Sequence, residues 1–531
     1  MINQGCSNRE LDQAEVIGFL ADPALYAGVE GVDRFETHGN LVFLAGSEAW
    51  KIKRAVRFPY MDLSTLEKRR AACMREVEVN RQFAPDLYLG CVPITRTPGG
   101  KLAFDSGGEV VEWTVHMRRF EQSALLSHLA LEGKITGEVA RLVADVVYES
   151  HEGAARAFPQ SASGPIRRLV DTLSRSLATL HMFNGEDVAE FSRNARHQLD
   201  EAAATLDERG RCGYVRRCHG DLHLANIVMW RSRPMLYDAI EFDEAIATVD
   251  TLYDLAFLLM DLDWHGHRRA ANTILNRYLW RSKQHDDLRG LVALPLFLAL
   301  RAGIRAMVTT DRAAQVHNRG GQQDFDRARH YCRLALGYVA PEPPRLIAVG
   351  GLSGTGKSTL GAALAPDVGG SSGAVHLRSD LERKAMAGVG ELQRLPASAY
   401  TKEARDRIYA VLQEKARLAL TAGHSVIVDA VYAGEDERRS VEAVAANLGV
   451  PFRGLWLQAD PEKLISRVTA RRNDASDATS ETVRTQLSSD PGTMSPQWTV
   501  IDASGTANET LRFASLALGL VSSTMQGIEP T

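Results

Sequence analysis

CHGDLHLANI, residues 218–227, is the stretch from which the first two-thirds of the chain can be interpreted. Asp221 follows His-Gly directly, Asn226 stands five places further on, and apolar residues flank both. In phosphoryl transfer this spacing lets the Asp accept the proton of an attacking hydroxyl while the Asn binds a metal ion. A lone His-Gly-Asp is more often a turn than a site, so the interpretation depends on partners elsewhere in the chain.

A lysine that contacts nucleotide phosphates is expected on the third strand of a small N-terminal sheet. Lys51 ends the triplet AWK, which has the Ala-apolar-Lys pattern of such a strand. Lys53 lies two residues further on and shares the same face of the strand, so it is an alternative to Lys51. The helical segment 66–83 supplies the acidic partner of this lysine, for which Glu76 is the first candidate and Glu78 the second.

A second metal ligand is expected at the end of a strand that follows the loop. Asp238 fits this place because the apolar run 234–237 leads directly into it, and Glu241 and Asp243 are close enough to be alternatives. Met117 falls where a hinge between two lobes would present backbone groups to adenine. Together these residues predict a nucleotide and metal site assembled from distant parts of the chain.

The first domain resembles the aminoglycoside phosphotransferase and choline kinase group of small-molecule kinases. The resemblance covers roughly residues 30–335; it is carried by the Asp and Asn of the loop, by Asp238, and by DTLYDLA at 250–256, which is similar to the D-x-x-x-D-L-A segment of that group. It implies a two-lobed α+β fold of the protein-kinase type. Gly220 stands where protein kinases carry Arg, which removes a docking site for an activation-loop phosphate and favours a small-molecule acceptor. The short loop 37–40 departs from a glycine-rich G-x-G-x-x-G pattern.

GLSGTGKS, residues 351–358, is the most specific signal in the chain. It follows the apolar strand 345–349 and opens a helix, which is the context that a G-x-x-x-x-G-K-S phosphate loop requires. Backbone amides of such a loop surround the phosphates, the Lys reaches the β- and γ-phosphates, and the Ser binds magnesium. The expected nucleotide-binding residues are Gly351, Ser353, Gly354, Thr355, Gly356, Lys357, Ser358 and Thr359.

Two acidic residues follow strands of the same half of the chain. Asp429 ends the apolar strand 425–428, which is the Walker B pattern, and it is the expected partner of Ser358 at magnesium. Asp380 comes just after the strand 374–377, where a base that faces an acceptor is expected. It could also be the N-cap of the helix that begins there.

Arg467 and Arg471 lie on or just after a helix and precede the polar stretch 473–477. A lid that brings arginines to a transferred phosphate would have this composition, and a solvated helix end is the alternative. The segment from about 345 to 520 is similar to the P-loop kinases near polynucleotide kinase, zeta toxin and gluconate kinase. That resemblance implies that Asp380 is the acceptor base and that the two arginines belong to the lid.

Residues 340–344, APEPP, are the clearest linker because their three prolines stiffen the chain and remove backbone donors. Beyond them strands alternate with helices, which predicts a parallel α/β sheet. We therefore expect an α+β protein-kinase-like domain at 1–339, the linker, an α/β P-loop NTPase domain at 345–521 and a frayed tail at 522–531. This order of domains resembles bacterial bifunctional proteins that join an aminoglycoside phosphotransferase-like domain to an ATP-binding domain.

Composition argues against several other classes. The formal net charge of −4 provides no global basic field for nucleic acid. The six cysteines form no CxxC pair, which is typical of reduced thiols in a cytoplasmic protein. The longest apolar run, 291–300, is too short to span a bilayer and predicts a buried helix. We expect a cytoplasmic protein without a membrane anchor or a nucleic-acid partner; no oligomeric state is predicted.

The sequence thus predicts a bifunctional kinase with two ATP·Mg²⁺ sites on unrelated folds. Each site would transfer the γ-phosphate to a hydroxyl of a small molecule such as a sugar, an amino sugar or an aminoglycoside, with Asp221 and Asp380 as the bases. Two alternatives stay open. One domain could be a nucleotide-binding sensor that regulates the other, or the C-terminal domain could phosphorylate polynucleotide 5′-hydroxyls.

Overall fold

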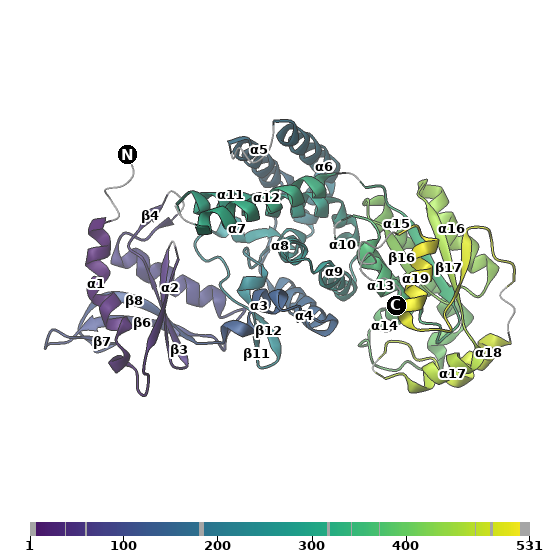
Figure 1. The fold of residues 1–531 in the computed structure, drawn as a ribbon, viewed down its shortest axis with the longest axis horizontal. Coiled ribbons are helices and arrows are strands. Elements are labelled where there is room, and N and C mark those ends of the chain that lie inside the picture. Colours follow the sequence, from purple (N-terminus) through teal and green to yellow (C-terminus); the bar gives the residue numbers. More distant parts are fainter. Residues whose placement is uncertain are drawn as a thin grey trace. The chain divides into compact units, whose positions relative to one another are not determined.

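The chain divides into two units in the computed structural model: Met1–Ala157 with Gly213–Leu258, and Phe158–Cys212 with Leu259–Thr531 (Figure 1). The residues that the structure describes are 7–37, 39–58, 61–179, 185–315, 319–340, 342–370, 372–472, 474–488 and 492–520. Outside them lie residue 38 of the loop 37–40, residue 341 of the expected linker, residue 473 of the expected lid, and the expected tail 522–531.

Strand alternation decides which face of the N-terminal sheet carries the lysines. Ala49 of strand β3 packs with residues of helix α2, whereas Trp50 and Ile52 pack with residues of helix α1 on the opposite face. Because side chains alternate along a strand, Lys51 and Lys53 share the α2 face with Ala49. The six antiparallel strands lie in the order β1-β2-β3-β8-β6-β7. These elements are α1 (Ser7–Ala21), β1 (Val32–Glu36), β2 (Asn40–Ala45), β3 (Glu48–Lys53), α2 (Leu66–Asn80), β6 (Tyr88–Arg96), β7 (Leu102–Phe104) and β8 (Glu109–Arg118).

The stretch 218–226 runs between two small groups of antiparallel strands. Strand β10 precedes it and pairs with β9 and β13, and β11 follows it and pairs with β12. The loop is therefore held at both ends by strand pairing. The remaining elements of this unit are β4 (Arg57–Phe58), β5 (Met61–Asp62), α3 (Leu126–Leu131), α4 (Gly137–Gly153), β9 (Arg156–Ala157), β10 (Val215–Arg217), β11 (Ile227–Trp230), β12 (Arg233–Leu236), α7 (Glu244–Ala247), β13 (Thr248–Asp250) and the first half of α8 (Thr251–Trp264).

The second unit begins with long helices. Among the described residues, the segment His285–Asp311 is long and apolar enough to cross a membrane by length and composition, but 67% of its most apolar window is buried inside the protein. The run 291–300 within it is almost wholly buried, so the predicted buried helix is confirmed. The helices are α5 (Ser163–Thr179), α6 (Gly185–Arg211), α9 (Arg268–Ser282), α10 (His285–Gly290), α11 (Leu294–Gln315) and α12 (Arg319–Val339).

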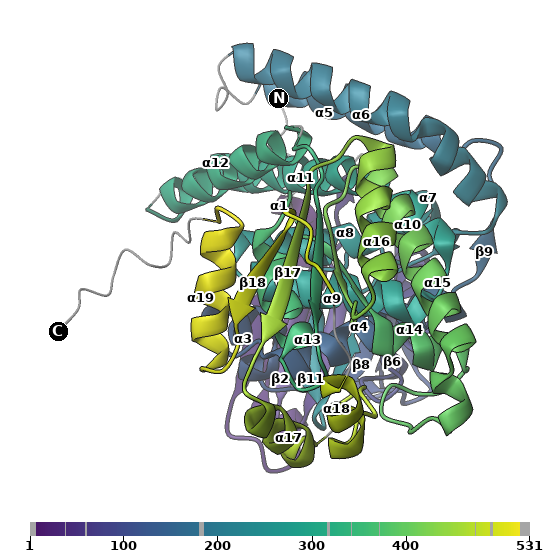
Figure 2. The same cartoon turned by 90° about the vertical axis from the view of Figure 1, so that its right-hand side faces the viewer.

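The predicted α/β fold of the C-terminal half is confirmed. Five parallel strands lie in the order β15-β16-β14-β17-β18, with α13 and α19 packed together on one side and α15 and α16 on the other (Figure 2). Buried aliphatic side chains of the central strands form the core beneath α13. The strands are β14 (Leu346–Gly351), β15 (Val375–Arg378), β16 (Val426–Asp429), β17 (Phe452–Gln458) and β18 (Trp498–Asp502). The helices are α13 (Lys357–Leu364), α14 (Ser379–Met386), α15 (Lys402–Thr421), α16 (Glu435–Leu448), α17 (Pro461–Ala470), α18 (Ser480–Leu487) and α19 (Ala507–Ala517).

Candidate active sites

Glu76 of helix α2 binds both candidate phosphate lysines. The Nζ atom of Lys51 lies 2.8 Å from Glu76 Oε1, and the Nζ atom of Lys53 lies 2.6 Å from Glu76 Oε2. The other candidate on this helix, Glu78, is exposed and pairs with Arg75. The structure therefore places Glu76 in the lysine cluster, and it places both lysines there with it.

The second partners of the two lysines distinguish them. Lys51 also lies 2.8 Å from Asp238 Oδ1, whereas Lys53 lies 2.6 Å from Glu241 Oε1. Burial alone would lower the pKa of each lysine, but the surrounding carboxylates raise the pKa of both. Burial would likewise raise the pKa of Glu76, and the two ammonium groups lower it instead. The cluster is thus a set of mutually stabilised charges, and Lys51 is the member joined to the candidate metal ligand.

The turn that carries Asp238 is held by neighbouring elements. Asp238 has a left-handed backbone with φ of +59°, and its N–H donates to the hydroxyl of Tyr88 at 3.2 Å. Asn80 at the end of α2 accepts from the N–H of Ala239 at 2.7 Å and donates to the carbonyl of the same residue at 3.3 Å. A left-handed non-glycine residue is costly, so such a turn persists only where its surroundings fix it. Asp243, the remaining alternative as a metal ligand, instead caps helix α7 with its carboxylate.

The carboxylate of Asp221 receives two local contacts. Asn226 Nδ2 donates to Asp221 Oδ2 at 3.0 Å, and His223 Nε2 lies 3.3 Å from the same oxygen. Because the Nδ1 atom of His223 accepts from the N–H of Ala225, Nε2 carries the proton and donates to Asp221. The structure therefore brings the predicted base and the predicted metal-binding Asn together, and it adds His223, which sequence reasoning did not select.

Asp254 of helix α8 fixes the backbone on which Asp221 stands. Its carboxylate accepts from the N–H of Gly220 at 2.8 Å and from the N–H of His219 at 3.3 Å. Gly220 has φ of +83°, and a Cβ atom there would lie 3.2 Å from Ile240, so the loop has little room for a larger residue. The segment 250–256 that carries Asp254 was selected from the sequence, but this role within it was not.

Met117 lies inside strand β8, in register with Ala49 on one side and Tyr88 on the other. Its side chain is buried in the core between the sheet and α2. The strand ends one residue later, at Arg118. The predicted contact between this segment and adenine stays a prediction.

The C-terminal phosphate loop joins strand β14 to helix α13 as predicted. Gly354 has φ of +89°, and a Cβ atom there would lie 2.7 Å from the carbonyl oxygen of Leu464, so the loop accepts only glycine at this position. The Nζ atom of Lys357 donates to the carbonyl of Leu352 at 3.0 Å. Burial lowers the pKa of this lysine, and the carboxylates of Asp429 and Asp380 offset part of that effect. A desolvated ammonium group is therefore available to an anion.

Ser358 and Asp429 form an oxygen-donor pair beside this lysine. The Oγ atom of Ser358 donates to Asp429 Oδ1 at 3.2 Å, and His376 Nε2 lies 2.8 Å from Asp429 Oδ2. Burial alone would raise the pKa of Asp429, but the hydrogen bond from His376 and the nearby cations lower it. A hydroxyl and an ionised carboxylate suit magnesium, so the donor set fits the predicted metal. His376 was not selected from the sequence.

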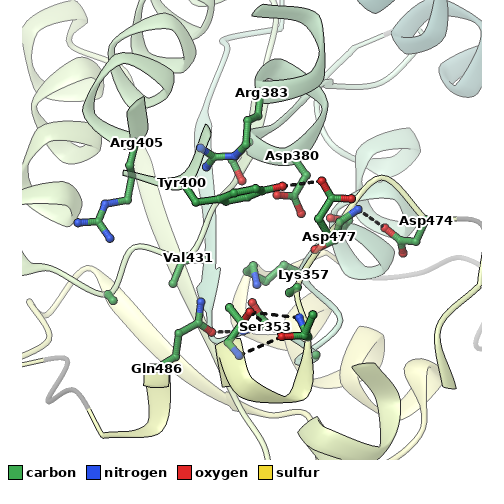
Figure 3. A pocket seen from close by; sticks show the side chains of 18 of the residues that line it. Ser353, Lys357, Asp380, Arg383, Tyr400, Arg405, Val431, Asp474, Asp477 and Gln486 are labelled. Carbon is green, nitrogen blue, oxygen red and sulfur yellow. Dashed lines mark hydrogen bonds between the residues drawn. The ribbon is translucent and has the colours of Figure 1, made fainter. Parts of the chain in front are cut away.

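A cavity of about 640 Å³ opens beside the phosphate loop (Figure 3). Asp380 lines it together with Lys357, Arg383 and Tyr400. Burial raises the pKa of Asp380, and a hydrogen bond from Ser476 partly opposes the shift. Helix α14 takes Arg378 as its N-cap residue, so Asp380 lies within the first turn and is not the cap. A carboxylate with a raised pKa in a cavity beside the phosphate-binding lysine is suited to accept a proton.

The two predicted lid arginines lie in different places. Arg471 lines the cavity and lies 3.7 Å from Asp474, whereas Arg467 donates to the carbonyls of Ala503 at 2.8 Å and Gly505 at 2.7 Å. Helix α17 ends before Arg471, whose backbone is extended. The two side chains therefore lie in different places, and of the two Arg471 lines the cavity. The lid role of both arginines stays a prediction.

Asp477 ties the segment after Arg471 to the opposite wall of the cavity. Its Oδ2 atom accepts from the hydroxyl of Tyr400 at 2.6 Å (Figure 3). The same oxygen accepts from Lys384 Nζ at 2.7 Å and from the N–H of Leu395 at 3.0 Å. Sequence reasoning selected the polar segment but not this contact. These hydrogen bonds join the segment that follows Arg471 to residues of the opposite side of the cavity.

Comparisons with known proteins match the C-terminal half to a family and the whole chain to a relative. Residues 346–490 match the family described as AAA domain. An uncharacterised protein of Mycobacterium tuberculosis is 29% identical over 458 residues, which is 85% of this chain and 88% of that protein.

Solved structures similar to the chain include a choline/ethanolamine kinase family protein from Mesorhizobium loti, with 15% identity over 61% of this chain and 99% of that chain and a TM-score of 0.34. Aminoglycoside 2′-phosphotransferase-IIIa in its GDP complex has 13% identity over 61% of this chain and 99% of that chain, with a TM-score of 0.36. A gluconokinase from Sinorhizobium meliloti has 22% identity over 35% of this chain and 99% of that chain, with a TM-score of 0.25.

The N-terminal half is thus an α+β domain, and the C-terminal half is an α/β P-loop domain that matches the AAA domain family at residues 346–490. Each half brings together residues that the sequence analysis selected for phosphoryl transfer.

Proposed function

We propose that the chain is a bifunctional ATP-dependent kinase, in which each site transfers the γ-phosphate to a hydroxyl of a small metabolite such as a sugar, an amino sugar or an aminoglycoside. One observation carries this proposal: each half of the chain has its own candidate base, a buried lysine and a pair of oxygen or amide ligands. A nucleotide sensor needs the lysine and the ligands but has no use for a base.

In the N-terminal site Asp221 accepts the proton of the acceptor hydroxyl while Asn226 holds its carboxylate in place. Lys51 contacts the nucleotide phosphates and is positioned by Glu76. Asn226 and Asp238 would hold magnesium, which bridges the phosphates and neutralises developing charge when ATP is bound.

In the C-terminal site Asp380 accepts the acceptor's proton, and burial raises its pKa, which makes the carboxylate a better base. The loop amides and Lys357 bind the phosphates, and Ser358 with Asp429 would hold magnesium. Arg471 contributes positive charge from the lid.

The net charge of −4 supports a small-molecule acceptor rather than nucleic acid. Reduced thiols support a cytoplasmic location, since the cysteines at 73, 91, 212 and 332 form no disulfide in the part of the chain that the structure describes.

The test compares ATP turnover of the full chain with that of Asp221→Asn, Asp380→Asn and the double variant, across sugars, amino sugars, nucleosides and 5′-hydroxyl oligonucleotides. Each single variant should lose one set of acceptors, and the double variant should lose all. Asp243→Asn, which changes a helix-capping carboxylate near the first site, is the matched control and should retain both sets.

Three outcomes would contradict the proposal in different places. Unchanged phosphorylation of every acceptor in Asp221→Asn would remove the catalytic role of the first site. If Asp380→Asn changed nothing while Lys357→Ala altered the first site's turnover, the C-terminal domain would be a nucleotide sensor. A phosphorylated oligonucleotide product would replace the small-molecule acceptor of the C-terminal site.

A further inference from the structure

Helix α9 carries a stripe of hydrogen-bonding residues four positions apart that faces the P-loop domain. Arg268 donates to the carbonyls of Pro366, Gly369 and Gly370. One turn on, Asn272 donates to the carbonyls of Ser372 and Ala374, and two turns further on Trp280 donates to the carbonyl of Leu381. Residues four apart share a helix face, so one face of α9 contacts the segment that leads into strand β15 and the helix α14 that follows it.

Asn276, the third member of this stripe, substitutes for a neighbouring strand. Its side-chain amide donates to the carbonyl of Ala374 at 3.1 Å and accepts from the N–H of His376 at 2.7 Å. Strand β15 is at the edge of the sheet, where backbone groups lack a strand partner. The amide of Asn276 therefore completes the hydrogen bonding of β15 at the residue that carries the imidazole of His376.

The imidazole of His376 is fixed on two further sides. Its Nε2 atom lies 2.8 Å from Asp429 Oδ2, and both side chains are almost completely buried. A Cβ atom built on Gly361 of helix α13 would lie 2.4 Å from the same nitrogen, so α13 lies directly against the ring. Since a carboxylate only accepts, the ring donates to Asp429 and leaves Oδ1, the oxygen that faces Ser358, for a metal.

We propose that His376 and Asn276 are positioning residues for the magnesium ligand Asp429. Helix α9 would then contribute, through Asn276, to metal binding at the C-terminal site. The proposal rests on the function proposed above, in which Ser358 and Asp429 bind magnesium with the nucleotide. His376 sets the orientation of the carboxylate, and Asn276 sets the position of His376 through its backbone. Partners behind a metal ligand commonly contribute about 10- to 100-fold to metal affinity.

The experiment measures ADP binding to the full chain by calorimetry, once with magnesium and once with EDTA. The ADP-binding event that disappears in Lys357→Ala is assigned to the C-terminal site. The magnesium preference of this site is the ratio of its ADP affinity with magnesium to its ADP affinity with EDTA. His376→Leu should reduce this preference by about 10-fold or more, and His376→Gln, which keeps an N–H donor, should restore part of it. Asn276→Ala should reduce it by about two- to fivefold because it acts through His376.

Arg268→Ala is the matched control, because it removes contacts of α9 with the P-loop domain without touching β15. It should leave the magnesium preference unchanged, and thermal unfolding of every variant reports whether the chain is folded. An unchanged preference in folded His376→Leu would overturn the proposal. An equal loss in Arg268→Ala and Asn276→Ala would overturn the role of Asn276. If Lys357→Ala removed no binding event, the proposed function of the C-terminal site would fail instead.

Discussion

The N-terminal and C-terminal sites each bury a lysine where nucleotide phosphates are expected, and they balance its charge differently. Lys51 lies 2.8 Å from both Glu76 and Asp238, and these carboxylates raise its pKa despite burial. Lys357 donates to the carbonyl of Leu352, and burial lowers its pKa. A phosphate that binds Lys51 must compete with Asp238, whereas one that binds Lys357 replaces a neutral carbonyl. An anion at the first site must therefore displace a carboxylate from its lysine, whereas an anion at the second displaces only a neutral group.

The two candidate bases, Asp221 and Asp380, differ in how far they are buried. The side chain of Asp221 is 39% exposed and receives hydrogen bonds from Asn226 and His223. Asp380 lies in the cavity beside Lys357, where burial raises its pKa. Burial thus disfavours the negative charge of Asp380, whereas the carboxylate of Asp221 is partly open to solvent.

Replacing Asp380 by Asn should have the largest effect on this contrast. Loss of a general base costs about 10²- to 10⁴-fold in rate, and phosphorylation of the C-terminal acceptors should fall by that factor. Because the raised pKa means that the fold disfavours the ionised form, the neutral amide should not lower the melting temperature. Steady-state turnover and thermal unfolding check the two parts, and a large fall in melting temperature would show that Asp380 is mainly structural.

Substituting the two N-terminal lysines should separate stability from binding. Lys53→Met leaves Glu241 buried without its lysine, and breaking a buried pair costs about 3–5 kcal/mol in free energy of unfolding. Lys51→Met leaves the half-exposed Asp238 to solvent, so it should cost less stability and more nucleotide affinity. Denaturant unfolding and nucleotide titration measure both. If Lys53→Met lost nucleotide binding at full stability, Lys53 would be the phosphate lysine.

The pH dependence should distinguish the buried base. Asp380 must be ionised to accept a proton, so turnover of the C-terminal acceptors should fall about tenfold per pH unit below its pKa. Since that pKa is raised, the decline should begin at a higher pH than the value of about 4 typical of an aspartate. A pH profile of kcat/KM tests this, and a profile that is flat down to pH 4 would contradict it.

Gln486→Ala should have the smallest effect. The Oε1 atom of Gln486 accepts from the N–H of Ser353 in the phosphate loop at 2.8 Å, and a phosphate oxygen must compete for that donor. Removing one such hydrogen bond should raise nucleotide affinity by roughly fivefold at most. Weaker binding in the variant would mean that Gln486 contacts the nucleotide itself.

The sequence was enough to predict the parts of the two sites that depend on a short motif or on the alternation of side chains along a strand. The phosphate loop requires a strand, glycines and a helix in direct succession, and all are found at 346–364. Lys51, Glu76 and Asp238 are far apart in sequence, yet strand alternation and their order in the chain were enough to select them. The alternatives Lys53 and Glu241 proved to be members of the same cluster.

What was missed depends on contacts between distant elements. His376 gains its role from Asp429, and Asn276 gains its role from a strand about 100 residues away. The four-residue spacing in α9 was a readable signal, but it did not reveal which surface it meets. Arg467 was selected because it lies near a helix end before a polar stretch, and it diverges from Arg471 because the helix ends between them. The bounds of the domains stay a prediction.

The amide of Asn276 also has a consequence for how this gene can be divided. A fragment that began at the proline-rich stretch 340–344 would contain every residue of the phosphate loop and the cavity, but it would lack α9. The edge of β15 would then present unpaired backbone groups to other chains, and such edges promote aggregation. If recombination transferred the P-loop segment alone, the product would therefore fail through aggregation and not through the loss of site residues. Selection would then favour inheritance of the two halves together.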